Sequence, residues 1–417
     1  MDIRVDQKRL REDLEATGHI GEVDTEEGWG RTVLTGTDAD REARDRFVER
    51  LEDAGLEVRV DPVGNIAGRW APESADPDAP PVAAGSHLDS VPEGGIFDGP
   101  LGAYAALEAV RAVQESSIEP ARPLEVVSWT GEEGVRFGTG LLGSSVASGV
   151  RTREEALALT DDEGNTLGDE LERIGYLGEG TVAPASWTAW LELHVEQGTV
   201  LERAGVPVGV VTAIAGIANC EVTFEGEANH AGATPMDERR DALAAASEFV
   251  LDVEGAAREQ VEAGHEAAVG TVGRLHVSPG ANNVVPGRVE LTTDQRDVDG
   301  ETLRRMIDRA GASADRIGTE RPVTVDFDHY RLTEPTRMAD RCVEAATAAA
   351  DRAGLESSRM HSAGLHDTAN VADRTDTVLL FAPSEDGISH NPREWTDWAD
   401  CANATRVLAG AMADLAT

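Results

Sequence analysis

The chain has 417 residues, of which 40% are hydrophobic, which is enough for large buried cores and, at about 100–200 residues per domain, for two or three domains. It carries 78 acidic and 37 basic residues, a net charge of -41, which excludes nucleic acid and anionic membranes as binding partners. Because the acidic residues are spread among aliphatic ones, we predict a folded protein rather than a disordered acidic chain. A folded protein with so large an acidic excess is typical of a halophile, in which salt screens the repulsion between its charges, so we also predict that its folding depends on salt.

The sequence lacks the features of an exported or membrane-spanning protein. No stretch of 18 uncharged apolar residues is present, and the start, Met1-Asp2-Ile3-Arg4, is charged from its second residue. The three cysteines, Cys220, Cys342 and Cys401, are scattered and odd in number, which argues against a disulfide framework. We therefore expect a soluble, cytoplasmic protein.

Apolar strands alternate with amphipathic helices along the first half of the chain, which predicts an α/β domain. Gly55 closes the first of these helices, and an alternating strand follows it directly. The predicted helices span residues 41–54 and 102–114, and the predicted strands span residues 56–61, 81–85, 124–129 and 188–193.

The pattern changes near residue 211 and then returns. Between residues 212 and 328 the order strand, helix, strand, strand, helix, strand predicts a small α+β unit. A helix over 340–353 and a strand over 377–382 resume the first pattern. We therefore predict a doubly wound catalytic domain with a mixed sheet from residues 1–211 and 329–417, interrupted by an inserted domain at 212–328.

Four of the apolar strands each lead to a candidate metal ligand. These are His87, the adjacent pair Glu132 and Glu133, His194 and, through a short loop, His390. Asp98 adds a carboxylate from a glycine-rich loop that allows close approach of the backbone. In open α/β sheets, sites form beyond the carboxyl ends of the strands, so these side chains are expected to converge.

Three imidazoles and two carboxylates favour zinc, manganese or nickel over magnesium or calcium. Five ligands are too many for one tetrahedral ion but suit two ions about 3.5–4 Å apart, between which a water is activated. Of the pair Glu132 and Glu133, one can bind metal while the other acts as general base. Asp89, two residues after His87, is expected to hold the far nitrogen of that imidazole.

Each of these residues has a simpler interpretation when taken alone. A single His or a Glu-Glu pair is usually structural or solvated, but several at strand ends beside glycines indicate a site. The GxGxxG match at residues 138–143 does not directly follow a strand and lacks a βαβ unit, so we do not interpret it as a dinucleotide site.

The motifs around these residues resemble the amidase branch of the M20 metallopeptidase superfamily, which contains N-carbamoyl-L-amino-acid hydrolases, β-ureidopropionases and allantoate amidohydrolases. The most specific is Glu-Leu-His-Val-Glu-Gln-Gly at 192–198, where many peptidases of the superfamily carry a carboxylate in place of His194. The other matching segments are 85–91, 97–102, 131–138 and 388–392.

This resemblance implies a role for each candidate residue in a two-metal hydrolase. One ion would be held by His87, Asp98 and His194, and the other by Asp98, Glu133 and His390, with Asp98 bridging. Glu132 would be the general base. Zinc is the expected metal, with manganese, nickel and cobalt as alternatives.

The resemblance also implies substrate contacts. The insert would be a lid and dimerisation domain, and its His230 would stabilise the developing oxyanion at a neighbouring active site. Asn283 would contact the substrate, Arg296 would bind its carboxylate through a planar fork, and Gln197 would contact the ureido end. The expected partners are a small carbamoyl or ureido amino acid and a second copy of the chain.

One segment departs from the family pattern. Where the family often has Ser-Gly-Ala-Gly-His-Asp-Ala, this chain has Ser-Ala-Gly-Leu-His-Asp-Thr at 362–368, which bears on substrate size. The sequence therefore predicts hydrolysis of N-carbamoyl-L-amino acids, with allantoate or another ureido acid as the alternative. A dipeptidase, an aminoacylase and a non-catalytic binding homologue are the remaining alternatives; His194 disfavours the first two and the intact ligand set disfavours the last.

Overall fold

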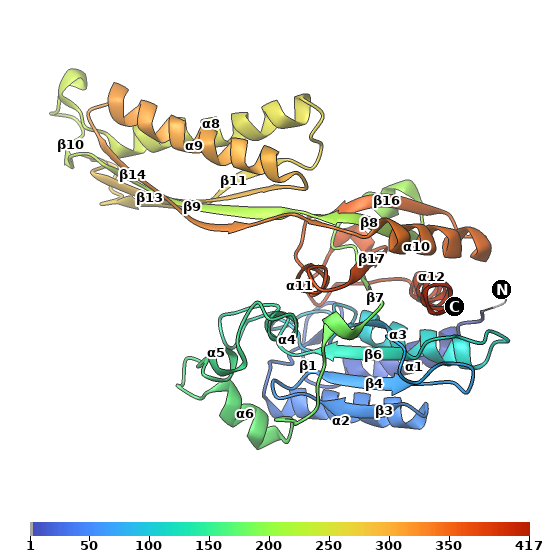
Figure 1. Cartoon of the computed structure of the whole chain (residues 1–417). Coiled ribbons are helices and arrows are strands. Elements are labelled where there is room, and N and C mark those ends of the chain that lie inside the picture. Colours follow the sequence, from blue (N-terminus) through green and yellow to red (C-terminus); the bar gives the residue numbers. More distant parts are fainter. Residues whose placement is uncertain (1–2) are drawn as a thin grey trace. The chain divides into compact units, whose positions relative to one another are not determined.

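The computed structural model describes residues 3–417, which divide into two compact units (Figure 1). The first comprises the described residues up to Thr212 together with Arg337–Met360 and His366–Thr417. The second comprises Ala213–Thr336 and the short stretch His361–Leu365. The second unit thus extends further along the chain than residues 212–328, because its last long strand continues past the predicted end.

The first unit contains a mixed sheet, as predicted for an α/β fold. Its helices are α1 (Gln7–Gly18), α2 (Asp38–Asp53), α3 (Pro100–Gln114), α4 (Leu142–Ala147), α5 (Arg153–Leu157), α6 (Leu167–Ile174), α7 (Val200–Ala204), α10 (Asp340–Ala353), α11 (Thr368–Val371) and α12 (Trp398–Ala416). Its strands are β1 (Glu22–Val23), β2 (Gly30–Arg31), β3 (Glu57–Val60), β4 (Ile66–Trp70), β5 (Val82–His87), β6 (Leu124–Trp129), β7 (Ala189–Val195), β8 (Val208–Ile214), β15 (Thr336–Arg337), β16 (Ser357–Ser362) and β17 (Asp376–Ala382).

The nine-stranded sheet has the order β15-β8-β17-β7-β5-β6-β4-β3, with β16 paired to β8. The four central strands, β17, β7, β5 and β6, are mutually parallel, while β4, β3 and β8 run antiparallel to their neighbours. Parallel strands end at the same edge, so the segments that follow β5, β6, β7 and β17 emerge together.

Helices cover both faces of this sheet. Gly102 of α3 packs against Ser86 on one face of β5, whereas Ala83 of the same strand shares a core cluster with Val371 of α11. Because alternate residues of a strand point to opposite faces, α3 and α11 lie on opposite sides. Coverage on both faces explains why β5, β6 and β7 are buried at every residue rather than at every second one.

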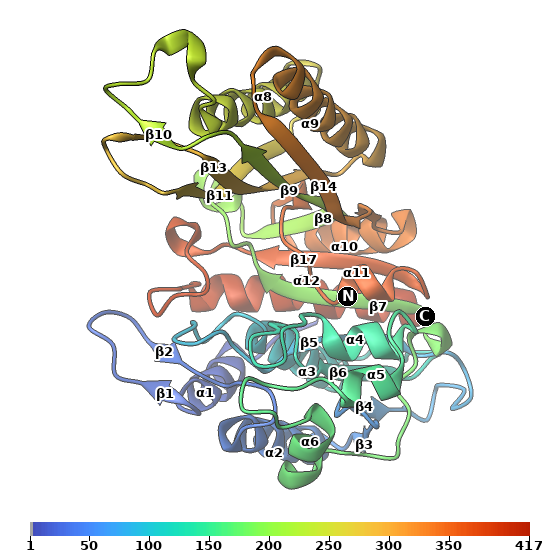
Figure 2. The same ribbon diagram turned by 90° about the vertical axis from the view of Figure 1, so that its left-hand side faces the viewer.

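The second unit is an antiparallel sheet covered by two helices (Figures 1 and 2). Its strands β9 (Gly216–Glu225), β11 (Val269–Ser278), β13 (Arg288–Asp297) and β14 (Thr324–Thr333) have the order β11-β13-β9-β14. The helices α8 (Ala242–Glu262) and α9 (Gly300–Glu320) pack on one face around Phe224, Phe249 and Ile317. A separate two-stranded sheet joins β10 (Asn229–His230) to β12 (Val284–Val285).

Two further sequence expectations concern thiols and helix hydropathy. Cys220, Cys342 and Cys401 are all free and buried, as expected of ordinary thiols. Among the residues that the structure describes, no helix combines the length and the apolar character needed to cross a membrane.

Candidate metal centre

The carboxyl edge of the parallel strands brings the predicted ligands together. His87 is the last residue of β5, His194 lies near the end of β7, and Glu132 and Glu133 follow β6 after a threonine and a glycine. His390 lies in the loop after β17, and Asp98 lies two residues before the start of α3. The convergence predicted from strand ends is therefore present in the first unit.

Asp98 lies at the centre of the cluster, and its two carboxylate oxygens face different partners. Oδ1 is 3.5 Å from Nε2 of His87 and 3.1 Å from Nε2 of His194. Oδ2 is 3.1 Å from Nε2 of His390, which is itself 3.5 Å from Oε2 of Glu133. One carboxylate with a separate set of donors at each oxygen has the geometry of a bridging ligand.

The two buried imidazoles are oriented by main-chain carbonyls. Nδ1 of His87 is 3.1 Å from the carbonyl oxygen of Asp89, and Nδ1 of His194 is 3.1 Å from that of Val195. Each ring therefore directs Nε2 toward Asp98, as in proteins whose metal-bound histidines use their second nitrogen to fix the tautomer. Nε2 of His87 is buried and has no hydrogen-bond partner among the described residues, as expected of a ligand atom.

Unusual backbone conformations support this arrangement. Gly99 has φ = 78°, and a Cβ atom there would lie 2.4 Å from the ring of His87. Gln197 and His390 adopt positive φ values of 57° and 55°, which are costly for residues with a side chain. Strain of this kind commonly marks functional sites, and here it falls on two candidate residues.

Glu132 and Glu133 are held apart by different contacts. Oε2 of Glu132 is 3.7 Å from Nε2 of His87, and its side chain is 12% exposed. Oε1 of Glu133 accepts a hydrogen bond from the backbone N–H of Val91, while Oε2 faces His390. The adjacent carboxylates therefore approach the centre from different positions.

The carboxylate of Asp89 does not make the contact to His87 that the sequence predicted. Its carboxylate is 3.6 Å from Nδ1 of His87, further than its own main-chain oxygen. The carboxylate instead accepts the backbone N–H groups of Glu132 (3.2 Å) and Glu133 (3.3 Å). Asp89 thus orients the loop that carries both glutamates, while its main-chain carbonyl orients the imidazole.

The electrostatics of the cluster are those of a site suited to cations. Burial raises the pKa of Glu132 well above its usual value, and the carboxylates of Asp367, Glu133 and Asp98 raise it further. Burial and Asp98 likewise raise the pKa of Glu133 to about 7. The hydrogen bond to Asp98 raises the pKa of His390 to about 9. Carboxylates crowded in a buried site repel one another, and divalent cations would relieve that repulsion.

Three groups of donor atoms lie within 4.8 Å of one another in the described part of the chain. They are His87 with Asp98 and His194, Asp98 with Glu133 and His390, and His87 with Glu132 and Glu133. The first two groups share Asp98 and mix imidazole with carboxylate, which suits two transition-metal or zinc ions. The residues present therefore fit a two-metal centre.

Gln197 occupies a position between ligands. Its Nε2 donates to Oδ2 of Asp98 (3.1 Å) and to Oγ of Ser389 (3.2 Å). The side chain predicted to contact substrate is therefore engaged with the central carboxylate in this structure.

His230 and Asn283 lie side by side within the second unit. The N–H of Ala231, next to His230, donates to the carbonyl of Asn283, and β10 pairs with β12 at this place. Nδ1 of His230 accepts the N–H groups of Gly232 and Ala233, both at 3.1 Å. The proton of the neutral ring therefore lies on Nε2, which is exposed and free to donate.

Arg296, also in the second unit, uses part of its guanidinium group in hydrogen bonds within that unit. Nε and Nη2 donate to the two carboxylate oxygens of Asp294 at 2.8 and 3.0 Å, and Nη1 donates to the carbonyl of Ala363. A guanidinium group carries five N–H bonds, so two remain, one on each terminal nitrogen. These two can still form a fork toward a carboxylate.

Sequence reasoning missed a second layer of acidic residues. Glu192 accepts from Ser86 and Thr368, and buried Asp367 accepts from Ser144 while its other oxygen has no hydrogen-bond partner among residues 3–417. Glu394 binds the backbone at Asp98. The sequence did contain a signal for Glu192, because a glutamate between two leucines in a buried strand requires buried hydrogen-bond partners.

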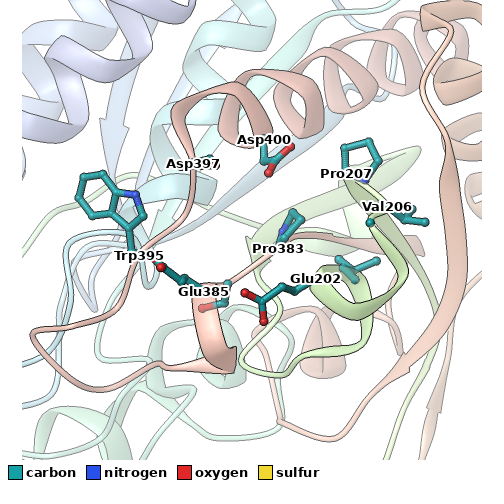
Figure 3. A pocket seen from close by; sticks show the side chains of 11 residues that line it. Glu202, Val206, Pro207, Pro383, Glu385, Trp395, Asp397 and Asp400 are labelled. Carbon is teal, nitrogen blue, oxygen red and sulfur yellow. The ribbon is translucent and has the colours of Figure 1, made fainter.

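A separate surface cavity of about 380 Å³ lies elsewhere in the first unit (Figure 3). Its apolar part includes Val206, Pro207, Pro383 and Trp395, and acidic side chains surround it. The acidic residues are Glu202, Glu385, Asp397 and Asp400. None of the candidate metal ligands lines this cavity, so its shape carries no information on the chemistry of the centre.

The mixed α/β sheet and these donors define a class of protein, an α/β scaffold with adjacent ligand sets for two divalent cations. The chain belongs to the Peptidase family M20/M25/M40, whose family model matches residues 83–414.

Relatives and solved structures narrow the similarity. An N-carbamoyl-L-amino acid amidohydrolase from Geobacillus stearothermophilus is 39% identical over 93% of this chain and 94% of its own. The allantoate amidohydrolase of Escherichia coli is 36% identical over 90% of each chain. The crystal structure of an amidase of the hydantoinase/carbamoylase family from Burkholderia multivorans superposes with a TM-score of 0.94 at 38% identity, covering 99% of this chain and 98% of that one.

Proposed function

We propose that this protein hydrolyses the C–N bond of N-carbamoyl-L-amino acids, releasing carbon dioxide, ammonia and the free amino acid. The chain is a hydrolase acting on C–N bonds other than peptide bonds. The observation that carries the proposal is Asp98, whose two oxygens face separate sets of ligands while Glu132 lies beside one of them. Relatives with amidohydrolase activity match nearly the whole chain, which supports the same chemistry.

The proposed centre is formed by residues of the first unit. His87, Asp98 and His194 would hold one divalent cation, and Asp98, Glu133 and His390 the other. Two cations bound there supply positive charge that polarises the scissile carbonyl and makes a neighbouring water more acidic. Glu132 takes the proton of the attacking water and returns it to the departing nitrogen, a role that is supported by its position 3.7 Å from Nε2 of the ligand His87.

Three residues of the second unit, together with Gln197 of the first, are proposed to contact the substrate. His230 donates through Nε2 to the developing oxyanion, a role supported by the tautomer that its Nδ1 contacts favour. Arg296 binds the substrate carboxylate through its two remaining N–H groups, and Asn283 and Gln197 contact the rest of the molecule. The family resemblance supports these four assignments.

The native metal and the assembly belong to the proposal as well. We assign zinc to the centre, with manganese, nickel and cobalt as alternatives, because imidazole and carboxylate ligands suit these ions. The second unit is assigned the roles of lid and dimerisation domain in a homodimer. The charge of -41 supports a cytoplasm of high salt as its environment.

The test is ammonia release in multimolar salt with added zinc or manganese. A panel of N-carbamoyl-L-amino acids is compared with allantoate and a dipeptide, using Glu132→Gln as the inactive control. Preferred turnover of the carbamoyl panel is the expected result. Turnover of the dipeptide alone would contradict the proposal, and an absence of turnover with metal bound would indicate a binding protein.

Allantoate is the second candidate substrate. The similarity to an allantoate amidohydrolase over 90% of the chain favours it, and the same metal ligands and base would serve. A higher kcat/KM for allantoate than for any member of the carbamoyl panel would replace the first substrate with the second while leaving the chemistry unchanged.

A further inference from the structure

Glu394 lies four residues after His390, and its carboxylate is buried although it has no cationic partner within ion-pair distance among the described residues. Its Oε1 accepts the backbone N–H groups of Phe97 (3.0 Å) and Asp98 (2.9 Å). Burial of a carboxylate is costly, so its hydrogen bonds to the turn before α3 require a structural or functional explanation.

The second oxygen of Glu394 reaches the central carboxylate through a serine. Oε2 is 2.8 Å from Oγ of Ser389, and that hydroxyl is 2.9 Å from Oδ2 of Asp98. Gln197 adds to the same network through its contacts to Asp98 and Ser389. Glu394 therefore contacts Asp98 twice, once at its backbone and once, through Ser389, at its side chain.

The neighbouring backbone is adapted to this carboxylate. A Cβ atom at Gly95 would lie 2.3 Å from Oε1 of Glu394 and 2.5 Å from its Cβ, so a side chain at that position would displace it. The same loop is also held at Pro392, whose carbonyl accepts the N–H of Trp29 at 2.7 Å. The segment between His390 and Glu394 is thus held at two points.

We infer that Glu394 is a positioning residue that joins the Asp98 turn to the His390 loop and so sets how these two ligands meet. The inference rests on the proposed metal centre, because Asp98 and His390 matter only if they bind an ion. The ligand set of Asp98, Glu133 and His390 depends on both segments, whereas the set of His87, Asp98 and His194 depends on one. Loss of Glu394 is therefore expected to weaken ion binding by Asp98, Glu133 and His390 more than ion binding by the set that contains His87 and His194.

The test uses Co²⁺ alone as the probe, with the full-length protein freed of metal and held in high salt. Visible absorption and competition with a chelator measure the affinity of each of the two ions. In Glu394→Ala the ion held by Asp98, Glu133 and His390, identified as the ion that Glu133→Gln loses, is expected to bind about 10–100-fold more weakly, the range typical of residues that orient metal ligands. The other ion is expected to change by less.

Glu394→Gln is the conservative variant. Its amide oxygen can still accept the two N–H groups, and its amide nitrogen can donate to Ser389. Co²⁺ affinity is therefore expected to stay within about threefold of the wild type, as the same hydrogen bonds remain. If Glu394→Gln binds Co²⁺ as weakly as Glu394→Ala, positioning through hydrogen bonds is wrong.

Two further variants separate positioning from folding. Glu125→Gln removes another buried carboxylate, one that pairs with Arg59 and Arg69 at the start of β6, and is expected to leave both Co²⁺ affinities unchanged. Ser389→Ala removes the link between Glu394 and Oδ2 of Asp98, together with one acceptor of Gln197, but keeps the contacts of Glu394 to the backbone, and it is expected to weaken the same ion. If Glu394→Ala fails to fold by circular dichroism, Ser389→Ala decides the outcome.

The possible failures are distinguishable. Wild-type protein that binds no Co²⁺ would overturn the metal centre and this role with it. The positioning role alone would be overturned if the wild-type protein binds two ions and the folded Glu394→Ala or Ser389→Ala variant binds both of them with wild-type affinity.

Discussion

At the scale of single residues, the adjacent glutamates offer the sharpest contrast. Glu132 is proposed to move a proton and Glu133 to bind metal. We expect Glu132→Gln to lower kcat by about 10²–10⁴-fold, the usual contribution of a general base, while two ions per subunit stay bound. Metal content measured on the purified variant alongside turnover checks this.

Glu133→Gln is the matched variant for this prediction. It should lose one ion per subunit, because Glu133 belongs to the group with Asp98 and His390. The third donor group includes Glu132, so the opposite pattern, with metal lost from Glu132→Gln and kept in Glu133→Gln, would exchange the two roles.

The guanidinium of Arg296 carries the prediction on specificity. Arg296→Lys keeps the charge but removes the planar fork, so KM for N-carbamoyl amino acids is expected to rise about 10–100-fold, the equivalent of about 1.5–3 kcal/mol for a charge-assisted hydrogen bond. KM for the corresponding substrate amides, which lack the carboxylate, should change little. Arg288→Lys, at the other end of β13 and paired with Glu225 and Glu290, is the control. Equal KM increases for both substrate types would contradict the assignment.

Much of the centre could be predicted from the sequence, because strand ends and glycine-flanked acids are local signals. The main-chain carbonyls that orient His87 and His194 could not be predicted, because any residue supplies such a carbonyl. The link from Glu394 to Asp98 also escaped prediction, since Glu394 lies beyond the strand end that marks His390 and binds main-chain N–H groups, which any residue supplies. The contacts of Asp89 show the same limit: its neighbour in sequence was His87, but the folded loop gave its carboxylate two N–H donors instead.

At the scale of helices and strands, predicted and observed positions agree best where hydrophobic periodicity is strong. The helix predicted over 340–353 corresponds to α10 without a shift, and the strands before His87 and after residue 376 were displaced by one or two residues. In the predicted α+β unit, the first long helix begins at Ala242, because Asp241 is its N-cap and accepts two backbone N–H groups. Short helices such as α4 and α5 span fewer than two turns, too few to show an amphipathic repeat, and were not recognised.

The packing of α3 against α1 leads to a prediction on pH. Tyr104 of α3 is buried and accepts a hydrogen bond from Thr17 of α1, and burial raises its pKa to about 12. The unfolded chain loses this proton near pH 10, while the folded chain keeps it, so the unfolding free energy falls as pH rises from 10 toward 12. At about 1.4 kcal/mol per pKa unit, the loss is about 2–3 kcal/mol.

Tyr104→Phe tests this contribution. The variant loses about 1 kcal/mol at neutral pH with the hydrogen bond, but its stability should fall less steeply above pH 10. Urea unfolding at a series of pH values in constant high salt measures the slope. Tyr330→Phe, at an exposed position in the second unit, should follow the wild type. If the slopes of Tyr104→Phe and the wild type coincide, burial of this phenol does not contribute to alkaline unfolding.

At the scale of the whole molecule, charge governs stability through two opposing effects. Ion pairs such as that of Arg316 with Asp252 are weakened by salt, whereas repulsion between unpaired acids is relieved by it. If every one of the 37 basic residues paired with one acid, 78 − 37 = 41 acids would remain unpaired. Exposed ion pairs contribute only about 0–1 kcal/mol each, so relief of repulsion is expected to dominate.

The unfolding free energy is therefore expected to rise as NaCl increases from 0.1 M to 1 M, while the screening length falls from about 10 Å to about 3 Å. Most of the gain in unfolding free energy should occur between these two concentrations, because the screening length at 1 M is already about 3 Å and more salt shortens it little. Sulfate separates screening from salting-out: at equal ionic strength, screening predicts the same gain with either anion, whereas surface exclusion predicts a larger gain with sulfate that continues to rise. Urea midpoints in each salt measure both effects. A protein equally stable in dilute buffer and in 1 M NaCl would show that its acidic surface does not limit its fold, and the proposed high-salt environment would lose its physical support.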